Sequence, residues 1–470
     1  MVERFLEVMK VADQLIVGID IGSTKFSSAV ALYNRSGSIQ YLGHGSTPSA
    51  GLNGGRVTDP EALARAVKMA LDEVRHLAGA PIQDLVISVA GAQVAPIDRR
   101  GQIRLDGARP ISQREVERAI ESASSEDPEG LRTIHRVVRG FAVNGESTQG
   151  PLGRYGSDLE VSLRDFAVTT ELVEGIREAA GAASTRVHAF VPGGVAAGEA
   201  ALTAEERQQG VILVDIGGAT TDVAVYIDGE LHDLSGFPLG GHHLTQDLAL
   251  VLEVPLEEAE RLKCRDGVSS PADAAKVPVD WGPRGIARIQ RQARDGTLSG
   301  DVVRAITGAR MEQILQRAKE IALRTDGHNQ PQSGSIVVTG GSSRLRGIED
   351  VASAVFGLPA RRGDILQSDG FPPIADPTSS ASVGLVRYCA SRGAWAAQPP
   401  PEQHGGRPQR LEKEKRGWTT KPARVPERRD EPVPHQQVNV IQYAGTVETR
   451  DWGKLMRDWM RGFIPVRTDA

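Results

Sequence analysis

Short apolar runs and longer helical patterns alternate through the first 390 residues of the chain. The apolar runs are rich in β-branched residues and are bounded by aspartate or glycine: LIVGID at 15–20, DLVISVAG at 84–91, VILVDIGG at 211–218 and SIVVTGG at 335–341. Between them, apolar residues recur at helical spacing, as at 60–79 and 309–324. Buried strands that alternate with helices predict an α/β fold.

A separate apolar pattern lies near the end of the chain, where it predicts a helix at 449–467. Its apolar residues share one helical face: Trp452, Leu455, Met456, Trp459, Met460, Phe463 and Ile464. The other face carries Lys454, Arg457, Asp458 and Arg461, and Pro465 ends the helix. Tryptophan and phenylalanine opposite lysine and arginine are typical of a helix that lies in a lipid interface. The alternative is a terminal helix that docks on the body.

The segment before this helix, 391–448, is predicted to be a disordered linker. Its part at 391–440 holds eight prolines, ten basic and six acidic residues. Roughly sixty such residues reach about 40 Å, which favours a spacer over docking. Trp395 and Trp418 within it are either docking spots or isolated aromatics. The mixed signs of its charges argue against a nucleic-acid partner.

Charge and cysteine content refine this division between body and tail. The net charge of −5 combines 15 Lys/Arg and 10 Asp/Glu after residue 390 with 40 and 50 before it. A basic tail on an acidic body predicts that the tail contacts an anionic surface. Two cysteines, Cys264 and Cys389, indicate a reducing compartment. The acidic residues near the start argue against a signal peptide, and no apolar run is long enough to span a membrane as a helix.

Two glycine-containing segments resemble each other, VGIDIGSTKFSSAVAL at 17–32 and LVDIGGATTDVAVYI at 213–227. Each is a strand that ends in an aspartate, a turn and a second strand, which predicts two similar half-domains that face one another. Backbone N–H groups of such turns bind phosphates, here through Gly22, Ser23, Thr24 and Lys25 in one half and Gly217, Gly218, Ala219 and Thr220 in the other. Asp20 and Asp215 then suit Mg²⁺, mostly through its waters. The alternative is a plain hairpin turn in each half.

A third glycine pair, Gly340 and Gly341, follows a predicted strand and precedes a predicted helix. It lets a base or phosphate approach the backbone, although an ordinary strand-to-helix turn is the alternative. The spacing of GIDIGSTK does not match a P-loop, and there is no Gly-x-Ser-x-Gly for acyl transfer. Adjacent His242 and His243 point in different directions on a helix, which argues against a metal site there.

DIGSTK, DIGGATTD and VVTGGSSRLRG occur in the order and spacing of the actin-like ATPase superfamily. Within it the chain resembles the FtsA family of bacterial cell-division proteins, also at ADPTSSASVGLVRY (375–388) and GGRVTDPEALARAVKMALDE (54–73). The resemblance implies an actin-like, ribonuclease H-like fold of two lobes with ATP and Mg²⁺ between them. It divides the chain into lobe I (14–90, 166–205 and 376–390), an inserted subdomain (91–165), and lobe II (206–242, 243–330 and 331–375).

The resemblance also implies partners and site residues. It places FtsZ docking on 243–330, and the adenosine contacts on Glu260, Lys263, Gly340, Gly341, Ser342 and Arg344. It predicts a peripheral protein at the division septum, on the cytoplasmic side of the inner or plasma membrane, which polymerises there on anionic lipid and recruits later division proteins. Many superfamily members carry a water-positioning glutamate where this chain has Val191, so we expect slow hydrolysis at best.

Two other functions stay open from the sequence. A pilus-assembly adaptor has the same fold and a different partner. A small-molecule kinase of the same superfamily would need a carboxylate base facing a substrate pocket, and a membrane helix would serve no purpose in it.

Overall fold

The computed structural model describes residues 14–34, 38–53, 56–124, 126–148, 150–268, 280–324, 334–368, 370–374 and 376–392. The linker from 393 onward and the predicted membrane helix at 449–467 lie outside these residues. Among the residues described, no helix is both long and apolar enough to cross a membrane.

Lobe I is built on a five-stranded sheet in the order β11-β6-β1-β2-β3. Its strands are β1 (Gln14–Ile21), β2 (Lys25–Tyr33), β3 (Ile39–Pro48), β6 (Asp84–Val89) and β11 (Arg186–Pro192). The first three form an antiparallel meander, while β6 and β11 run parallel to β1. A small hairpin of β4 (Leu52–Asn53) and β5 (Arg56–Val57) and the helices α2 (Pro60–Ala78) and α4 (Thr170–Ala182) complete this part.

Helix α2 shows how local chemistry sets these boundaries. Asp59 accepts a hydrogen bond from the Ala62 N–H at the first turn, and Pro60 occupies the first helical position. Gly79 ends the helix in the left-handed region at φ 62°. The helix ends one residue before the predicted 60–79 pattern does.

Lobe II repeats the same sheet, in the order β14-β13-β12-β15-β16. Its strands are β12 (Val211–Ile216), β13 (Thr221–Ile227), β14 (Glu230–Phe237), β15 (Ser335–Thr339) and β16 (Ala360–Arg362). The two sequence-similar segments form equivalent hairpins, β1–β2 and β12–β13. In register, Asp20 lies opposite Ser27, and Asp215 lies opposite Asp222. The repeat predicted from the sequence is therefore also a repeat in the structure.

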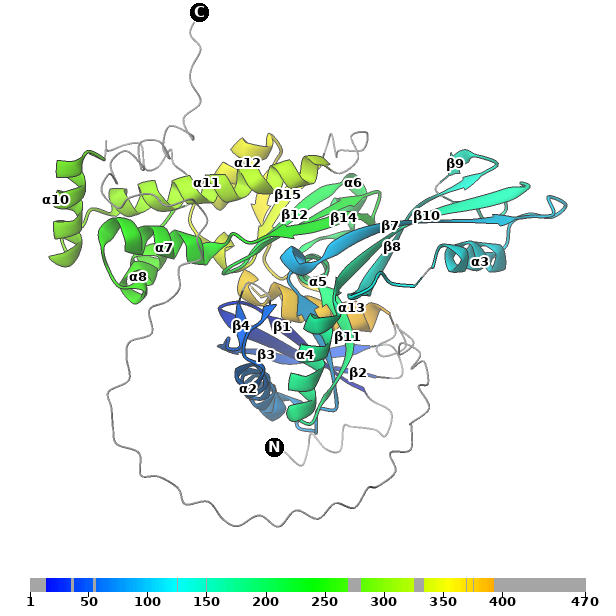
Figure 1. Ribbon diagram of the computed structural model, residues 1–470, viewed down its shortest axis with the longest axis horizontal. Coiled ribbons are helices and arrows are strands. Elements are labelled where there is room, and N and C mark those ends of the chain that lie inside the picture. Colours follow the sequence, from blue (N-terminus) through cyan, green and yellow to red (C-terminus); the bar gives the residue numbers. More distant parts are fainter. Residues whose placement is uncertain are drawn as a thin grey trace, which may run out of the picture.

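Helices pack on the lobe II sheet, and some of them lie beyond its edge (Figure 1). They are α6 (Ala204–Gln209), α7 (Gly241–Leu252), α8 (Leu256–Asp266), α10 (Pro283–Arg294), α11 (Gly300–Arg324) and α12 (Ile348–Phe356). One end of α11 packs with α7, α8 and α10 around Leu248, Leu252 and Ile306, and its other end packs on the sheet through Met311 and Leu315. Helix α11 begins nine residues before the predicted 309–324 pattern does.

A third sheet projects from the side of the molecule (Figure 1). We call it the insert: β7 (Ala95–Arg104), β8 (Leu131–Val143), β9 (Glu146–Thr148) and β10 (Asp158–Thr169), in the order β7-β10-β8-β9, with α3 (Gln113–Ala123) on one face. It has a core of its own that includes Ile111, Leu159, Val161 and Leu163. A short 3₁₀ turn, η1 (Gly91–Gln93), leads from β6 into it.

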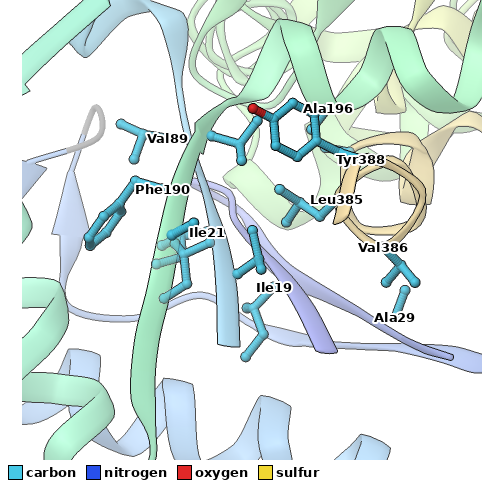
Figure 2. Close-up of a cluster of buried hydrophobic side chains, with 14 of the residues drawn as sticks. Ile19, Ile21, Ala29, Val89, Phe190, Ala196, Leu385, Val386 and Tyr388 are labelled. Carbon is cyan, nitrogen blue, oxygen red and sulfur yellow. The ribbon is translucent and has the colours of Figure 1, made fainter. Parts of the chain in front are cut away.

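Helices α5 (Gly193–Ala201) and α13 (Ser380–Ser391) cross between the two large sheets (Figure 1). Leu385 and Val386 of α13 pack over Ile19 and Ala29 of the lobe I sheet, as Figure 2 shows. The crossing is close: a Cβ on Gly384 would lie 1.7 Å from the carbonyl oxygen of Ala196. Because α13 also packs on β1 and α5 on β12, this contact holds the two sheets together.

Candidate nucleotide-binding site

Three aspartates meet where the strands of the two lobes end. Asp20 is the last residue but one of β1, Asp215 is the last residue but one of β12, and Asp222 is the second residue of β13, directly opposite Asp215. Asp222 is 5% exposed, while the other two are partly buried. Antiparallel neighbours in register place their side chains on the same face, so Asp215 and Asp222 share one side of the hairpin.

Burial dominates the electrostatics of these carboxyl groups. It raises the pKa of Asp20, although a hydrogen bond from Ser88 and the charge of Lys25 oppose the shift. Burial raises the pKa of Asp215 well above its ordinary value, and the negative charges of Asp222 and Asp20 add to it. Burial also raises the pKa of Asp222 to about 7, against hydrogen bonds from the Gly91 and Gly194 N–H groups. Three closely spaced carboxyl groups that repel one another attract a cation.

The two predicted phosphate loops touch each other. A Cβ on Gly218 would lie 2.3 Å from Thr24 Cγ2, so only glycine allows this approach of the loops. Within the second loop, the Gly217 N–H donates to the Thr220 carbonyl oxygen at 2.9 Å, which closes the turn around Ala219. Ser23, Ala219 and Thr220 are partly buried and Thr24 is exposed. The structure therefore brings the two loops together beside the aspartates.

The third glycine segment completes the same cluster. Gly340 has φ 82°, and a Cβ there would lie 2.2 Å from Asp215 Oδ1. Ser342 Oγ donates to the Gly217 carbonyl oxygen at 3.3 Å. By contrast, a Cβ on Gly341 would make only an ordinary contact, 3.9 Å from Thr378 Cγ2, and Gly341 is exposed. Gly340 thus packs against the carboxylate, whereas Gly341 is accessible at the surface.

Glu260 and Lys263 lie on α8 and reach the start of α7. Lys263 Nζ donates to the Gly241 carbonyl oxygen at 3.2 Å, to Thr245 Oγ1 at 3.0 Å and to Glu260 Oε2 at 2.7 Å. Gly241 in turn donates its N–H to the Gly217 carbonyl oxygen at 2.9 Å. Glu260 and Lys263 are therefore linked to the phosphate loop of lobe II through the first turn of α7.

Lys25 and Arg344 lie on the other side of the cluster, near the connector that leads into α13. Burial lowers the pKa of Lys25, while Asp376 and Asp20 oppose the shift and Arg344 adds to it. Burial would raise the pKa of Asp376, but hydrogen bonds from Thr378 and the charge of Lys25 bring it below its ordinary value. Arg344 itself is exposed. Charged residues of the β1–β2 hairpin, of the segment around Arg344 and of the connector before α13 therefore lie close together.

The position of the expected water-orienting acid holds an apolar residue. Val191 is fully buried in β11, opposite Ser88 of β6. Glu199, further along α5, forms an ion pair with Arg207 at 3.3 Å, so its carboxylate is engaged by Arg207. Among the described residues, no group of three or more His, Cys, Asp or Glu side chains is arranged to hold a metal ion directly.

Sequence reasoning did not single out Asp222, Thr245 or the N–H of Gly91. Asp222 lies inside the quoted DIGGATTD motif, and its place opposite Asp215 follows from the hairpin register. Gly91 lies 131 residues away from Asp222, so no local pattern links the two. The predicted membrane-inserting residues from Trp452 to Ile464 lie outside the described residues.

Comparison with known proteins identifies the family. The family model "Cell division protein FtsA" matches residues 212–384, and "SHS2 domain inserted in FTSA" matches residues 91–164. The chain is 27% identical over 383 residues to the cell division protein FtsA of Pseudomonas aeruginosa, covering 80% of this chain and 89% of that protein. For the FtsA of Escherichia coli K12 the identity is 27% over 390 residues, covering 81% and 92%.

A solved structure agrees on the fold. The PilM–PilN type IV pilus biogenesis complex superposes with a TM-score of 0.52 at 18% identity, covering 82% of this chain and 99% of that chain. At this identity the likeness supports the fold alone. With the repeated sheets, the inserted subdomain and both family models in agreement, the chain has the actin-like fold and belongs to the FtsA family of cell-division proteins.

Proposed function

We propose that this chain is an ATP-binding division protein that assembles on the inner face of the cytoplasmic membrane and anchors FtsZ there. The observation that carries the nucleotide part is the meeting of both phosphate loops, at Gly218 and Thr24, beside three aspartates. The loops supply backbone N–H groups for phosphates, and the aspartates supply negative charge for a cation. FtsA family membership supports the division role.

Asp20 and Asp215 are the residues that would hold Mg²⁺, mostly through its waters. Carboxyl oxygens are the hard ligands that this ion prefers, and when bound it neutralises phosphate charge. Gly341 and Ser342, with Lys263 and Glu260, surround the side on which we place the adenosine. Because Val191 is apolar and Glu199 is paired with Arg207, hydrolysis is slow and the nucleotide acts mainly as a conformational ligand.

We place the membrane contact in the amphipathic segment 449–467. Each basic residue near an anionic leaflet contributes about 1 kcal/mol, so one short helix binds reversibly. Several tails on one polymer raise the local concentration of anchors and bind together. Assembly of the body and binding of the tail therefore reinforce each other, and FtsZ bound to 243–330 is held at the membrane.

A sedimentation experiment tests the whole proposal. Purified FtsZ and the full chain are mixed with Mg-ATP and liposomes that contain anionic phosphatidylglycerol. We expect both proteins to pellet together, and deletion of 449–470 to leave both in the supernatant. Replacing Trp452 and Trp459 with glutamate should have the same effect, whereas replacing the linker residues Trp395 and Trp418 with alanine, the matched control, should not.

Two results would refute parts of this proposal. If the truncated chain still pellets, the anchor lies elsewhere. If the full chain pellets and leaves FtsZ behind, the division partner is wrong, and the same assay with a pilus-assembly protein tests the alternative adaptor. Sugar- or glycerol-dependent ATP turnover at ordinary kinase rates would favour the kinase alternative.

A further inference from the structure

The insert is joined by the chain to lobe I at both ends. It begins after β6, through η1, and it ends where β10 leads into α4. Across space it contacts both lobes: β8 lies against β11 of lobe I, and β7 and β8 lie against β14 of lobe II. The insert therefore bridges the two lobes, packing on lobe I at its base and on lobe II along β14.

Arg164 on β10 makes the main polar contact with lobe II. Its guanidinium donates to both carboxyl oxygens of Asp98 in β7, at 2.7 and 2.9 Å, and its third nitrogen lies 2.9 Å from Asp233 Oδ1 in β14. The Arg164 side chain is 11% exposed and Asp233 is 19% exposed, so water screens this pair weakly. Arg139 Nη2 lies 2.7 Å from His232 Nε2, next to it on the same strand of lobe II.

The stem of the insert contacts the aspartate cluster. The Gly91 N–H donates to Asp222 Oδ1 at 2.8 Å. A Cβ on Gly236 of β14 would lie 2.3 Å from the Ala92 nitrogen, so η1 packs closely against the paired strands β13 and β14. Any shift of lobe II relative to lobe I must therefore move or strain this stem.

We propose that the Arg164–Asp233 pair is a latch that makes the insert move with lobe II, so that a nucleotide bound between the lobes sets the position of the insert. The coupling rests on the nucleotide binding proposed above. A ligand that contacts both phosphate loops favours the state in which they are close. With the latch formed, the insert then turns about its two stems relative to lobe I. Without it, the remaining contacts of the insert with lobe II, among them Arg139–His232, are too weak to carry the insert along with that lobe.

Spin-label distances test the latch in the full chain. With exposed Cys264 replaced by serine, labels are placed at Tyr155→Cys in the insert and at either Leu323→Cys in lobe II or Leu77→Cys in lobe I; all three positions are exposed. Double electron–electron resonance is measured with and without a non-hydrolysable ATP analogue, and nucleotide affinity is measured on the same samples.

In the otherwise unmodified chain we expect a narrow insert-to-lobe II distance that nucleotide leaves unchanged. The insert-to-lobe I distance should shift by more than about 2 Å, the scale of a domain rearrangement. Asp233→Asn should broaden the first distribution and abolish the shift in the second. Asp98→Asn, which removes an ion pair of the same arginine inside the insert, is the control and should behave like the parent.

The outcomes separate this proposal from the one it rests on. Parent-like distributions in Asp233→Asn, with nucleotide still bound, would refute the latch. Equal broadening in Asp98→Asn would show that the arginine acts inside the insert alone and would also refute it. A parent chain that binds no nucleotide would refute the proposed nucleotide site and the coupling with it, whereas the width measured without nucleotide still reports whether the pair holds the insert.

Discussion

Replacing Asp222 with asparagine should change how the stability of the protein depends on pH. Asp222 is 5% exposed, and burial raises its pKa to about 7 from an ordinary value of 3.8. Between these two values the folded chain keeps a proton on Asp222 that the unfolded chain has released. The free energy of unfolding therefore falls as pH rises from about 4 to 7, and it levels off above that range.

The magnitude follows from the shift. About three pKa units at 1.36 kcal/mol each give about 4 kcal/mol lost between pH 4 and 8. Asparagine cannot ionise, so Asp222→Asn lacks this loss. It has one acceptor oxygen for the two N–H groups of Gly91 and Gly194, which costs about 1–3 kcal/mol at every pH. Removing the charge of Asp222 also relieves Asp215, which acts in the same direction.

Urea unfolding followed by far-ultraviolet circular dichroism at several pH values between 4.5 and 8 measures the effect. We expect Asp222→Asn to be less stable than the parent at pH 4.5 and equal or more stable at pH 8. The informative quantity is the difference between the two curves, because slopes from groups that do not interact with Asp222 cancel in it. A difference that stays flat across this range would show that Asp222 is already ionised in the folded protein and would refute the reasoning.

Two further predictions concern close contacts. Gly218→Val places a side chain where a Cβ would already lie 2.3 Å from Thr24 Cγ2, so binding of a fluorescent ATP analogue should be lost. Gly181→Ala, with nothing within 4 Å of its Cβ, should bind normally, and equal binding by both variants would contradict the contact between the loops. Gly384→Ala would put its Cβ 1.7 Å from the Ala196 carbonyl oxygen, and overpacking of about 1–3 kcal/mol should lower the midpoint of thermal unfolding. An unchanged midpoint would show that α5 and α13 can separate without cost.

The sequence was sufficient for the fold because its signals are local. The strand-aspartate-turn-strand segment occurs twice, and both copies form the same hairpin at the same place in equivalent sheets. The start of α2 was predictable because Asp59 and Pro60 cap and begin a helix by their own chemistry. The predicted pattern began at 309 and so missed the start of α11, although Val302, Val303 and Ile306 recur there at helical spacing and are buried.

The candidate site was predictable where it repeats and not where distant segments meet. Comparing the two copies draws attention to Asp20 and Asp215, which they share. It does not point to Asp222, because Ser27 takes the equivalent place in the first copy. Lys263 illustrates a second limit, since its contact with Gly241 depends on how α7 and α8 pack. Such contacts depend on tertiary packing, which cannot be predicted from residue type and spacing along the sequence.

Asp222 connects the proposed nucleotide site with the proposed latch, because its carboxyl group contacts the stem of the insert and lies near the other two aspartates. One of its neighbours is Asp20 of lobe I, whose charge raises the pKa of Asp222. Another is the Gly91 N–H at the stem of the insert, a donor that holds the ionised form more strongly than the neutral one. A cation brought by the nucleotide favours ionisation of Asp222 and so strengthens its hydrogen bond to the stem. Nucleotide binding would then strengthen the contact between the stem of the insert and lobe II, and this contact would act together with the Arg164–Asp233 latch to keep the insert with lobe II.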